Sequence, residues 1–554
     1  MRITDRSDLW WKTAVVYCLD VEKYLDWNDD GVGDFEGLAH RLDHLAGLGV
    51  SCLWLMPFQP SPRRDDGYDI TDFLTVDPRL GSLGDFVEFM RTARDRGMRV
   101  IIDFVMNHTS DQHPWFREAR RSRESRFRDF YVWRDEPPAK QQEVVFPGEE
   151  SSVWEYDERT DQYYLHSFYR HQPDLNIANP RVRDEIAKTM GFWLELGVSG
   201  FRVDAVPFLI EPPAGVDVGD PHEFLRDIRR YLQRRSSEAI MLGEVNLPYA
   251  GQVEFFGHVD KPAELALQFD FPAMQRMYLS FAREDATPLA ETLASRPELR
   301  IEAQWANFVR NHDELTLDQL SDDEREEVFD AFAPEEDQRI YGRGIARRLP
   351  PMVDGDPRRV ELAYSLLFSL PGTPVLFYGE EIGMGENPDL GGRMAMRSPM
   401  QWSTEANGGF SRAPARKLVA KPPTDGYAPE HVNVESQMHD EGSLLAKIRV
   451  FAHRFRSSPE IGWGRFELLE TRERSVLAHR LSADVGSFIA VHNFAARPVT
   501  VELALGEVPE QARLSDLLSE NVVPIDERGR AEVELGAYGY RWFRIVDSRD
   551  RRLT

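Results

Sequence analysis

Eight short apolar runs recur along the first 380 residues of this chain, and amphipathic stretches separate most of them. Runs that are apolar on both faces are typical of strands in a parallel sheet covered by helices. Eight strand–helix units predict a closed (β/α)8 TIM barrel, with an open doubly wound sheet as the alternative. Polar residues at nearly every strand end favour closure. The predicted strands span residues 15–21, 50–56, 100–106, 201–206, 240–245, 265–271, 308–310 and 375–378.

Breaks in this pattern predict further domains. About ninety residues follow the third predicted strand before the fourth begins, too many for one loop and helix, so we expect an inserted domain there. After residue 460 short runs alternate in polarity, which indicates an antiparallel β-sandwich. The predicted domains are a barrel (1–107 and 175–459), an inserted domain (108–174) and a C-terminal β-sandwich (460–554).

Two long excursions follow the last two predicted strands, at residues 314–351 and 381–434. Because strand ends meet at one face of a barrel, we expect both excursions to fold over the mouth of the site as a lid.

Composition narrows the classes of partner. The formal net charge is −27, which disfavours a nucleic-acid partner. The two cysteines, Cys18 and Cys52, lie in apolar runs and are expected to be buried thiols rather than a disulfide framework. No stretch reads as a secretion signal or a membrane span, so the expectation is a cytoplasmic protein without a membrane partner. Association into a homo-oligomer stays open.

Charged side chains gather where the predicted strands end. Arg202 and Asp204 are two residues apart on one strand and therefore point to the same face. Glu244 ends the next strand, and His312 and Asp313 end the seventh. Any one of these residues alone fits a helix cap or a structural ion pair. Because these residues are predicted to lie at the same depth on three strands, a catalytic site is favoured.

The chemistry that these residue types suit is retaining glycoside cleavage. One carboxylate, Asp204, attacks the anomeric carbon, while a protonated one, Glu244, donates to the leaving oxygen. Arg202 is expected to hold Asp204 ionised, and Asp313 to stabilise the charged sugar ring. Asp103 fits a place in a buried structural network as well as it fits a place in the catalytic site.

Four motifs carry a resemblance to a known family. Asp103-Phe-Val-Met-Asn-His108, Gly200-Phe-Arg-Val-Asp204, Gly243-Glu244-Val and Asn311-His312-Asp313 resemble the four conserved regions of glycoside hydrolase family 13, the α-amylase family. The resemblance covers roughly the whole chain. It implies that Asp204 is the nucleophile, Glu244 the acid/base and Asp313 the transition-state stabiliser. It implies that the glucose site is walled by Asp65, Tyr68, His108, Arg202 and His312.

Several further stretches are most similar to the family members that isomerise maltose and trehalose, among them Arg64-Asp-Asp-Gly-Tyr-Asp-Ile, His171-Gln-Pro-Asp-Leu-Asn and Arg397-Ser-Pro-Met-Gln-Trp. This likeness implies a disaccharide substrate such as maltose or trehalose, with Gln172 and Arg397 also in the glucose site. The implied reaction is intramolecular transglucosylation through a glucosyl–Asp204 intermediate, with a hydrolytic side reaction. The near alternative is a hydrolytic α-glucosidase. The distant one is a non-catalytic partner subunit, which the catalytic carboxylates disfavour.

The chain departs from those members at three places. The first strand reads Tyr17-Cys-Leu-Asp-Val-Glu-Lys-Tyr where an Arg and a Phe are typical, and Glu244 is followed by Val-Asn-Leu-Pro. After Arg393 the usual Asp is missing. Met394 and Met396 follow instead, and we expect these apolar residues on the acceptor side. The donor glucose is therefore better determined than the acceptor.

Two calcium sites are expected, both structural, and the chemistry needs no organic cofactor. The first is a loop in which oxygen ligands recur at every second residue, with glycines for the tight turn, the pattern of a Ca²⁺ loop; its members are Asp26, Asn28, Asp30, Val32 and Asp34. A solvated acidic turn is the alternative. The second site is implied only by the resemblance, and its members are Asn107, Asp174, Phe208, Leu209 and Glu211.

Overall fold

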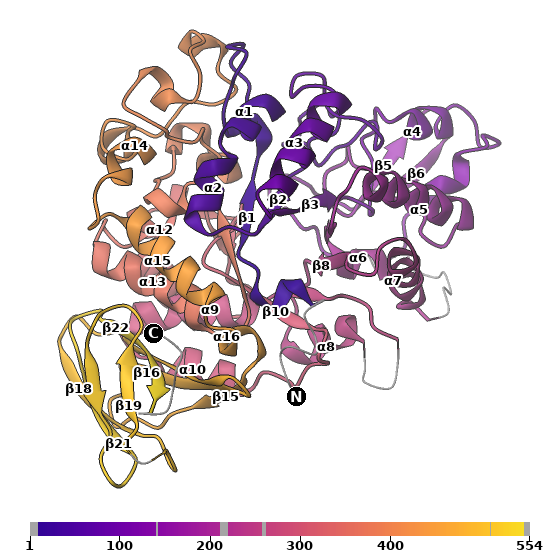
Figure 1. Cartoon of the computed structure of the whole chain (residues 1–554). Coiled ribbons are helices and arrows are strands. Elements are labelled where there is room, and N and C mark those ends of the chain that lie inside the picture. The colour runs from indigo at the N-terminus through magenta and orange to yellow at the C-terminus, as the bar shows by residue number, and fades with distance from the viewer. Residues whose placement is uncertain (1–8, 140–141, 211–219, 258–261, 510, 548–554) are drawn as a thin grey trace.

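The computed structural model describes residues 9–139, 142–210, 220–257, 262–509 and 511–547 (Figure 1). Eight parallel strands close into a barrel in the order β1-β14-β10-β9-β8-β7-β3-β2, which confirms the predicted closure. These strands are β1 (Val16–Leu19), β2 (Cys52–Leu55), β3 (Arg99–Phe104), β7 (Gly200–Val203), β8 (Ile240–Gly243), β9 (Leu267–Phe269), β10 (Gln304–Phe308) and β14 (Thr373–Phe377).

The seventh barrel strand was predicted wrongly at 308–310, because β10 ends where the prediction began. Polar residues within β10 interrupt its apolar pattern, so a prediction from apolar runs misses most of this strand. Gln304 and Asn307 are buried within the strand, where their side-chain amides donate to backbone carbonyls of Gly462 and Leu370. Hydrogen bonding offsets the cost of burying an amide, so a strand can carry one in its interior.

Helices lie around the outside of the barrel (Figure 1). In α3, Ser82 and Asp85 form a capping box, and Phe86, Phe89 and Ala93 are buried on one face. The principal barrel helices are α1 (Phe35–His40), α2 (Leu42–Leu48), α3 (Leu83–Asp95), α5 (Pro180–Glu195), α6 (Val206–Ile210), α7 (Glu223–Arg235), α8 (Tyr249–Phe256), α9 (Phe271–Arg283), α10 (Thr287–Ala294), α13 (Pro357–Ser369) and α15 (Leu444–Arg456).

The segment between β3 and α5 forms a separate small unit beside the barrel (Figure 1). It contains α4 (Pro114–Ala119) and an antiparallel sheet of β4 (Trp133–Arg134), β6 (Gln162–Leu165) and β5 (Trp154–Asp157). His108 and Asp174 pair in an isolated antiparallel bridge, where the chain leaves the barrel and returns. The fold therefore carries an insertion after the third barrel strand.

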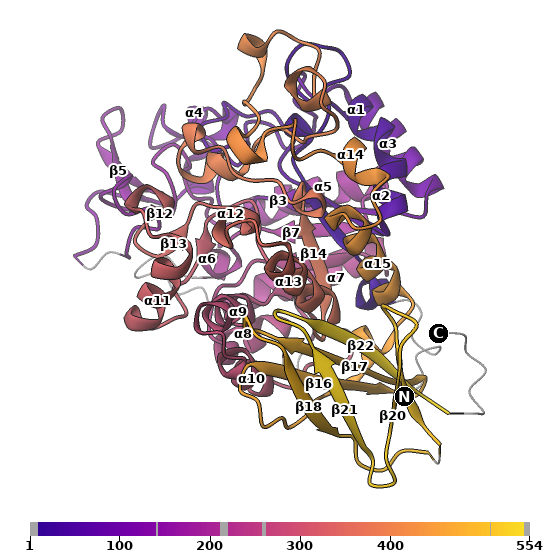
Figure 2. The same cartoon turned by 90° about the vertical axis from the view of Figure 1, so that its left-hand side faces the viewer.

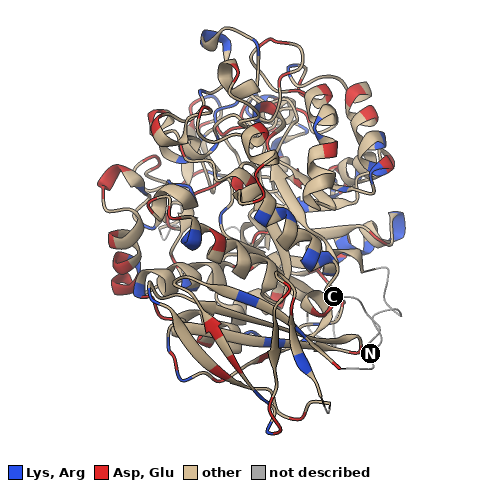
Figure 3. Cartoon of the chain, turned by 60° about the vertical axis from the view of Figure 1, so that its left-hand side comes forward, with Lys and Arg blue, Asp and Glu red and all other residues tan. Residues whose placement is uncertain are grey.

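The first excursion, after β10, contains β11 (Leu315–Thr316), α11 (Asp322–Phe332), β12 (Arg339–Ile340), β13 (Gly344–Ile345) and α12 (Leu349–Met352). Figure 2 shows β12 and β13 on the same side of the molecule as β5 of the insertion. The guanidinium of Arg343 donates to the carbonyl of Val145 at 2.8 Å, so the excursion and the inserted segment touch. Acidic residues gather on α11 (Figure 3).

The C-terminal part is built from antiparallel sheets, as predicted. A six-stranded sheet and a two-stranded sheet share one apolar core that includes Ile489, Val501 and Val533. Their strands are β15 (Arg465–Leu468), β16 (Val476–Ala483), β17 (Gly486–Asn493), β22 (Tyr540–Val546), β19 (Arg513–Asp516) and β20 (Val522–Pro524), and then β18 (Val499–Ala504) and β21 (Arg530–Leu535). Among the helices described, none is long and apolar enough to cross a membrane.

Candidate active site

Arg202, at the end of β7, joins the two predicted catalytic carboxylates. Its Nη1 donates to Asp204 Oδ1 at 2.6 Å, and its Nη2 donates to Glu244 Oε2 at 2.8 Å. The backbone after Asp204 turns into the left-handed region at Ala205 (φ 47°), and the Ala205 N–H then donates to Glu244 Oε2 at 3.2 Å. A non-glycine residue in that region is uncommon and is held by its surroundings. One guanidinium thus fixes both carboxylates at the barrel mouth.

Asp103 belongs to a buried network behind these carboxylates, which supports the structural interpretation of this residue. Its oxygens accept hydrogen bonds from Arg202 at 2.7 Å, Trp54 at 2.9 Å and Tyr68 at 3.0 Å. The Tyr68 hydroxyl is also hydrogen-bonded to His312 Nε2 at 2.7 Å. The network therefore orients Arg202 and Tyr68 together.

Asp313 is surrounded by cationic and polar side chains. Its Oδ1 accepts from Arg393 at 2.7 Å and from Arg397 at 2.9 Å. Its Oδ2 lies 3.1 Å from His312 Nε2. Burial opposes ionisation, yet His312, Arg393 and Arg397 together hold the pKa of Asp313 well below its usual range. Asp313 is therefore a carboxylate at neutral pH.

The pKa values of Asp204 and Glu244 are raised to about 7, chiefly because burial disfavours the charged form. Arg202 opposes both shifts. Since the two groups share this arginine and repel each other, they titrate as a pair. Raised pKa values of this kind favour one protonated group beside one ionised group, which is the state that a general acid and a nucleophile need together.

A cavity of about 460 Å³ opens above these groups. The predicted residues that line it are Asp65, Tyr68, His108, Asp204, Glu244 and Asp313. Both ring nitrogens of His108 are buried and have no hydrogen-bond partner among the described residues.

Four predicted substrate-binding residues, Gln172, Arg202, His312 and Arg397, do not line this cavity. They contact residues that do: Gln172 donates to Asp65 at 2.8 Å, and Arg397 donates to Asp313. In this structure they hold the residues that line the cavity and do not line it themselves.

Other lining residues were missed from the sequence. Arg393 bridges Asp313 and Asp65, the latter at 3.0 Å. Met394 and Met396, expected on the acceptor side, are not in the lining, and Met396 is buried against Ala346 and Ala395. Further lining comes from loop residues such as Phe146, Asn246, Glu314 and Arg343, and from Phe271, the first residue of α9.

In the loop at residues 26–34, side-chain oxygens accept hydrogen bonds from nearby backbone N–H groups. Asp26 accepts N–H bonds from Asp29 and Gly31, each at 2.8 Å, and Asp34 accepts one from Gly37 at 2.7 Å. The side-chain oxygens of Asn28 and Asp30 accept from the N–H two residues on. Within the described chain, the carboxylates of this loop are not among the acidic groups that converge within 4.8 Å. The predicted calcium site here stays a prediction.

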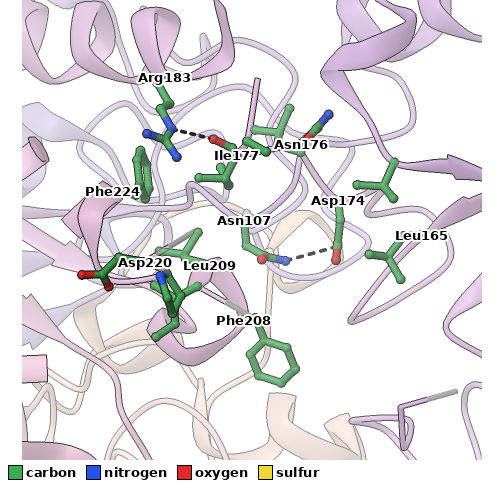
Figure 4. A pocket seen from close by; sticks show the side chains of 15 residues that line it. Asn107, Leu165, Asp174, Asn176, Ile177, Arg183, Phe208, Leu209, Asp220 and Phe224 are labelled. Atoms are coloured by element: carbon green, nitrogen blue, oxygen red, sulfur yellow. Dashed lines mark hydrogen bonds between the residues drawn. The ribbon is translucent and has the colours of Figure 1, made fainter. Parts of the chain in front are cut away.

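The second predicted metal set surrounds a cavity of about 50 Å³ beside the inserted segment. Figure 4 shows Asn107 and Asp174 pointing toward each other, with Phe208 and Leu209 nearby. Asn107 donates to Asp174 at 3.1 Å, and burial raises the pKa of Asp174 to about 7. A cation would offset the burial of this carboxylate, so the donors fit one. Glu211 lies outside the described residues.

Comparisons with known proteins agree with this geometry. The family model "Alpha amylase, catalytic domain" matches residues 21–332 and 347–461, and "Sucrose hydrolase-like, C-terminal domain" matches 486–544. The chain is 41% identical over 561 residues to a trehalose synthase of Pimelobacter sp. (strain R48), covering 97% of this chain and 96% of that one. It is 32% identical to a "Probable alpha-glucosidase" of Rhizobium meliloti (strain 1021), over 97% of each. A crystal structure of an α-amylase from H. orenii superposes with a TM-score of 0.79 at 26% identity, covering 97% of this chain and 100% of that one.

The chain belongs to the α-amylase family, glycoside hydrolase family 13. It is an enzyme of the retaining glucosyl transferase, isomerase or glycoside hydrolase type.

Proposed function

We propose that this enzyme interconverts maltose and trehalose by moving one glucosyl unit within a retained disaccharide. The observation that carries the proposal is the single guanidinium of Arg202 bridging Asp204 and Glu244 at the base of a cavity of about 460 Å³. A cavity of that size suits a small sugar rather than a polymer. The 41% identity to a full-length trehalose synthase supports the choice of substrate.

In the first half-reaction the Asp204 carboxylate attacks the anomeric carbon, and the glycosidic C–O bond breaks. Glu244 gives its proton to the departing oxygen, so a glucose molecule forms and stays in the cavity beside a glucosyl ester on Asp204. Asp313, fully ionised beside the ring, stabilises the positive charge that develops at the anomeric carbon. The contacts through Arg202 favour the short carboxyl separation of a retaining pair, about 5–5.5 Å.

In the second half-reaction the retained glucose turns and presents a different hydroxyl. Glu244, now a carboxylate, removes the proton of that hydroxyl, whose oxygen attacks the anomeric carbon and displaces Asp204. Attack from the 4-hydroxyl restores maltose, and attack from the anomeric hydroxyl yields trehalose. Attack by water instead yields two glucose molecules.

A hydrolytic α-glucosidase is the second candidate. The 32% identity to a relative described as a probable α-glucosidase supports it. The same carboxylates serve both reactions, and the outcome depends on how well the closed mouth keeps water from the glucosyl ester.

Product analysis separates the two functions. The enzyme is incubated with maltose in the presence of isotopically labelled free glucose. Trehalose that carries no label is the expected product and demonstrates intramolecular transfer. If glucose is the only product at every maltose concentration, the enzyme is a hydrolase.

Structural calcium at the 26–34 loop and beside Asp174 is part of the proposal, supported by the ligand spacing and by the buried Asp174 carboxylate. A cytoplasmic location and self-association stay predictions.

A further inference from the structure

A buried cluster of charges lies behind the active site, between the turn after β1 and the loop after β2. Lys23 is fully buried, and its Nζ lies 2.9 Å from Asp20 Oδ2 and 2.9 Å from Asp66. Asp20, Glu22 and Asp66 offer carboxylate oxygens within 4.8 Å of one another, the spacing of a metal site. The Lys23 ammonium lies among these oxygens and supplies the positive charge.

Asp66 is the centre of this cluster. Besides Lys23, it accepts hydrogen bonds from Arg63 at 3.1 Å and from Arg397 at 2.8 Å. Its side chain is 5% exposed and does not line the substrate cavity. Three cations around one buried carboxylate fix its position, because moving it would take a carboxylate partner from each of them.

Arg397 connects Asp66 to the reaction centre. Its Nε donates to the carbonyl of His312 at 2.8 Å, its Nη1 donates to Asp66, and its Nη2 donates to Asp313 at 2.9 Å. These three bonds hold the planar guanidinium of Arg397 in one orientation. The bond to Asp66 therefore determines the direction in which Nη2 donates to Asp313.

We propose that Asp66, with Lys23 as its buried counter-charge, is a positioning residue that holds Arg397 and therefore Asp313 in place for glucosyl transfer. The turn after β1 supplies Asp20 and Lys23. This inference rests on the proposed function. Its mechanism is indirect, since Asp66 touches neither substrate nor reacting atoms.

The kinetic test compares two buried aspartates. Asp66→Asn keeps the shape of the side chain but removes its charge, and Asp77→Asn does the same for a buried carboxylate whose ion-pair partner among the described residues is Arg79. Supporting groups of this kind are worth about 10–100-fold in activity. With maltose we expect kcat of Asp66→Asn to fall by that factor while KM changes little, because Asp313 acts mainly on the transition state. Asp77→Asn should keep the kcat of the unchanged enzyme even if its Tm falls.

A crystal structure of Asp66→Asn gives a readout that does not depend on activity. We expect Arg397 to turn away and its contact with Asp313 to lengthen beyond hydrogen-bonding distance. If Asp66→Asn does not fold, Lys23→Gln removes the counter-charge and leaves Asp66 in place, with a smaller fall in kcat expected.

Unchanged Arg397 and Asp313 positions in Asp66→Asn would overturn the inference, as would an equal loss of kcat in Asp66→Asn and Asp77→Asn. Where Lys23→Gln has to replace Asp66→Asn, an unchanged kcat would overturn it. If the unchanged enzyme acts on no α-glucoside, the proposed function fails, and the crystal structure still decides whether Asp66 positions Arg397.

Discussion

At the scale of single residues, Arg202 allows the two catalytic carboxylates, Asp204 and Glu244, to take different roles. It is bonded to Asp204, Glu244 and Asp103, so its charge is shared among three acidic groups. A shared positive charge allows one carboxylate to be ionised while burial keeps its neighbour protonated. Glu244 holds the proton in the first half-reaction and is a carboxylate in the second, in which Asp204 carries the glucosyl group, as retention requires.

Replacing Glu244 by Gln removes the proton that the leaving oxygen needs. We expect kcat/KM for maltose to fall by about 10²–10⁴-fold, the usual contribution of a general acid. For 4-nitrophenyl α-glucoside the glucosylation step should lose much less, because nitrophenolate departs without protonation. Steady-state and burst kinetics with both substrates measure the difference. An equal loss for both substrates would contradict the assignment of Glu244 as the acid.

The pH dependence of kcat/KM should be bell-shaped around pH 7. Below the pKa of the pair, both Asp204 and Glu244 are protonated and the nucleophile is lost. Above it, both are ionised and the acid is lost. In Glu244→Gln the alkaline limb should disappear while an acid limb remains. A profile of this variant that still falls on the alkaline side would assign that limb to another group.

At the scale of elements, the mouth of the cavity is shared by the insertion and the excursions. Arg343 donates to the carbonyl of Val145, and the rings of Phe146 and Tyr341 lie with their centroids 5.1 Å apart. The side chain of Arg393 lies over the Phe146 ring at 4.8 Å. These contacts support the expected lid, since they join segments distant in the sequence across the opening.

Arg343→Ala should let more water reach the glucosyl ester. One lost hydrogen bond is worth about 1 kcal/mol, so we expect the ratio of glucose to trehalose formed from maltose to rise about fivefold. Arg339→Ala is the matched control, because Arg339 lies on the same excursion but pairs with Glu326. Chromatography of the products gives the ratio. Equal ratios in both variants would show that Arg343 does not close the mouth.

The calcium sites can be tested through stability. If Ca²⁺ binds only the folded chain, a concentration of 100 Kd stabilises it by about 2.7 kcal/mol, and Tm rises with added calcium. Asp30→Asn tests the loop separately, since Asp30 is exposed and caps only Val32. We expect this variant to lose part of the calcium-dependent gain. A Tm that neither chelator nor calcium changes would rule out both sites.

At the scale of the whole molecule, two buried histidines join the C-terminal sheet to α13 of the barrel. His492 Nε2 is hydrogen-bonded to Ser365 Oγ at 2.9 Å, and His479 Nε2 lies 2.9 Å from the carbonyl of Ser369. Their rings are stacked with centroids 6.2 Å apart. Burial lowers the pKa of His479 to about 4 and lowers that of His492 well below its usual value.

Acid should therefore weaken the fold through this interface. The unfolded chain binds protons at these histidines below about pH 6.5, whereas the folded chain does not until about pH 4. Stability is thus lost as pH falls through this window, by up to about 1.4 kcal/mol per pH unit for each histidine. Tm measured from pH 7 to pH 4.5 should fall less steeply in His479→Asn/His492→Asn. The exposed His439→Asn is the control, and a slope equal to that of the control would contradict the interface model.

The sequence by itself determined the barrel and the order of its catalytic groups. Apolar runs are a local property, and the alternation of side chains along a strand places Arg202 and Asp204 on one face wherever the strand ends. The identity of the supports was decided only by the tertiary structure. Lys23, Asp66, Arg393 and Arg397 meet because their strands and loops converge at one end of the barrel, and no spacing along the chain encodes that meeting. A buried charge pairs with an opposite charge that lies near it in space. Which residues line the cavity and which support the lining residues therefore depends on the closed fold.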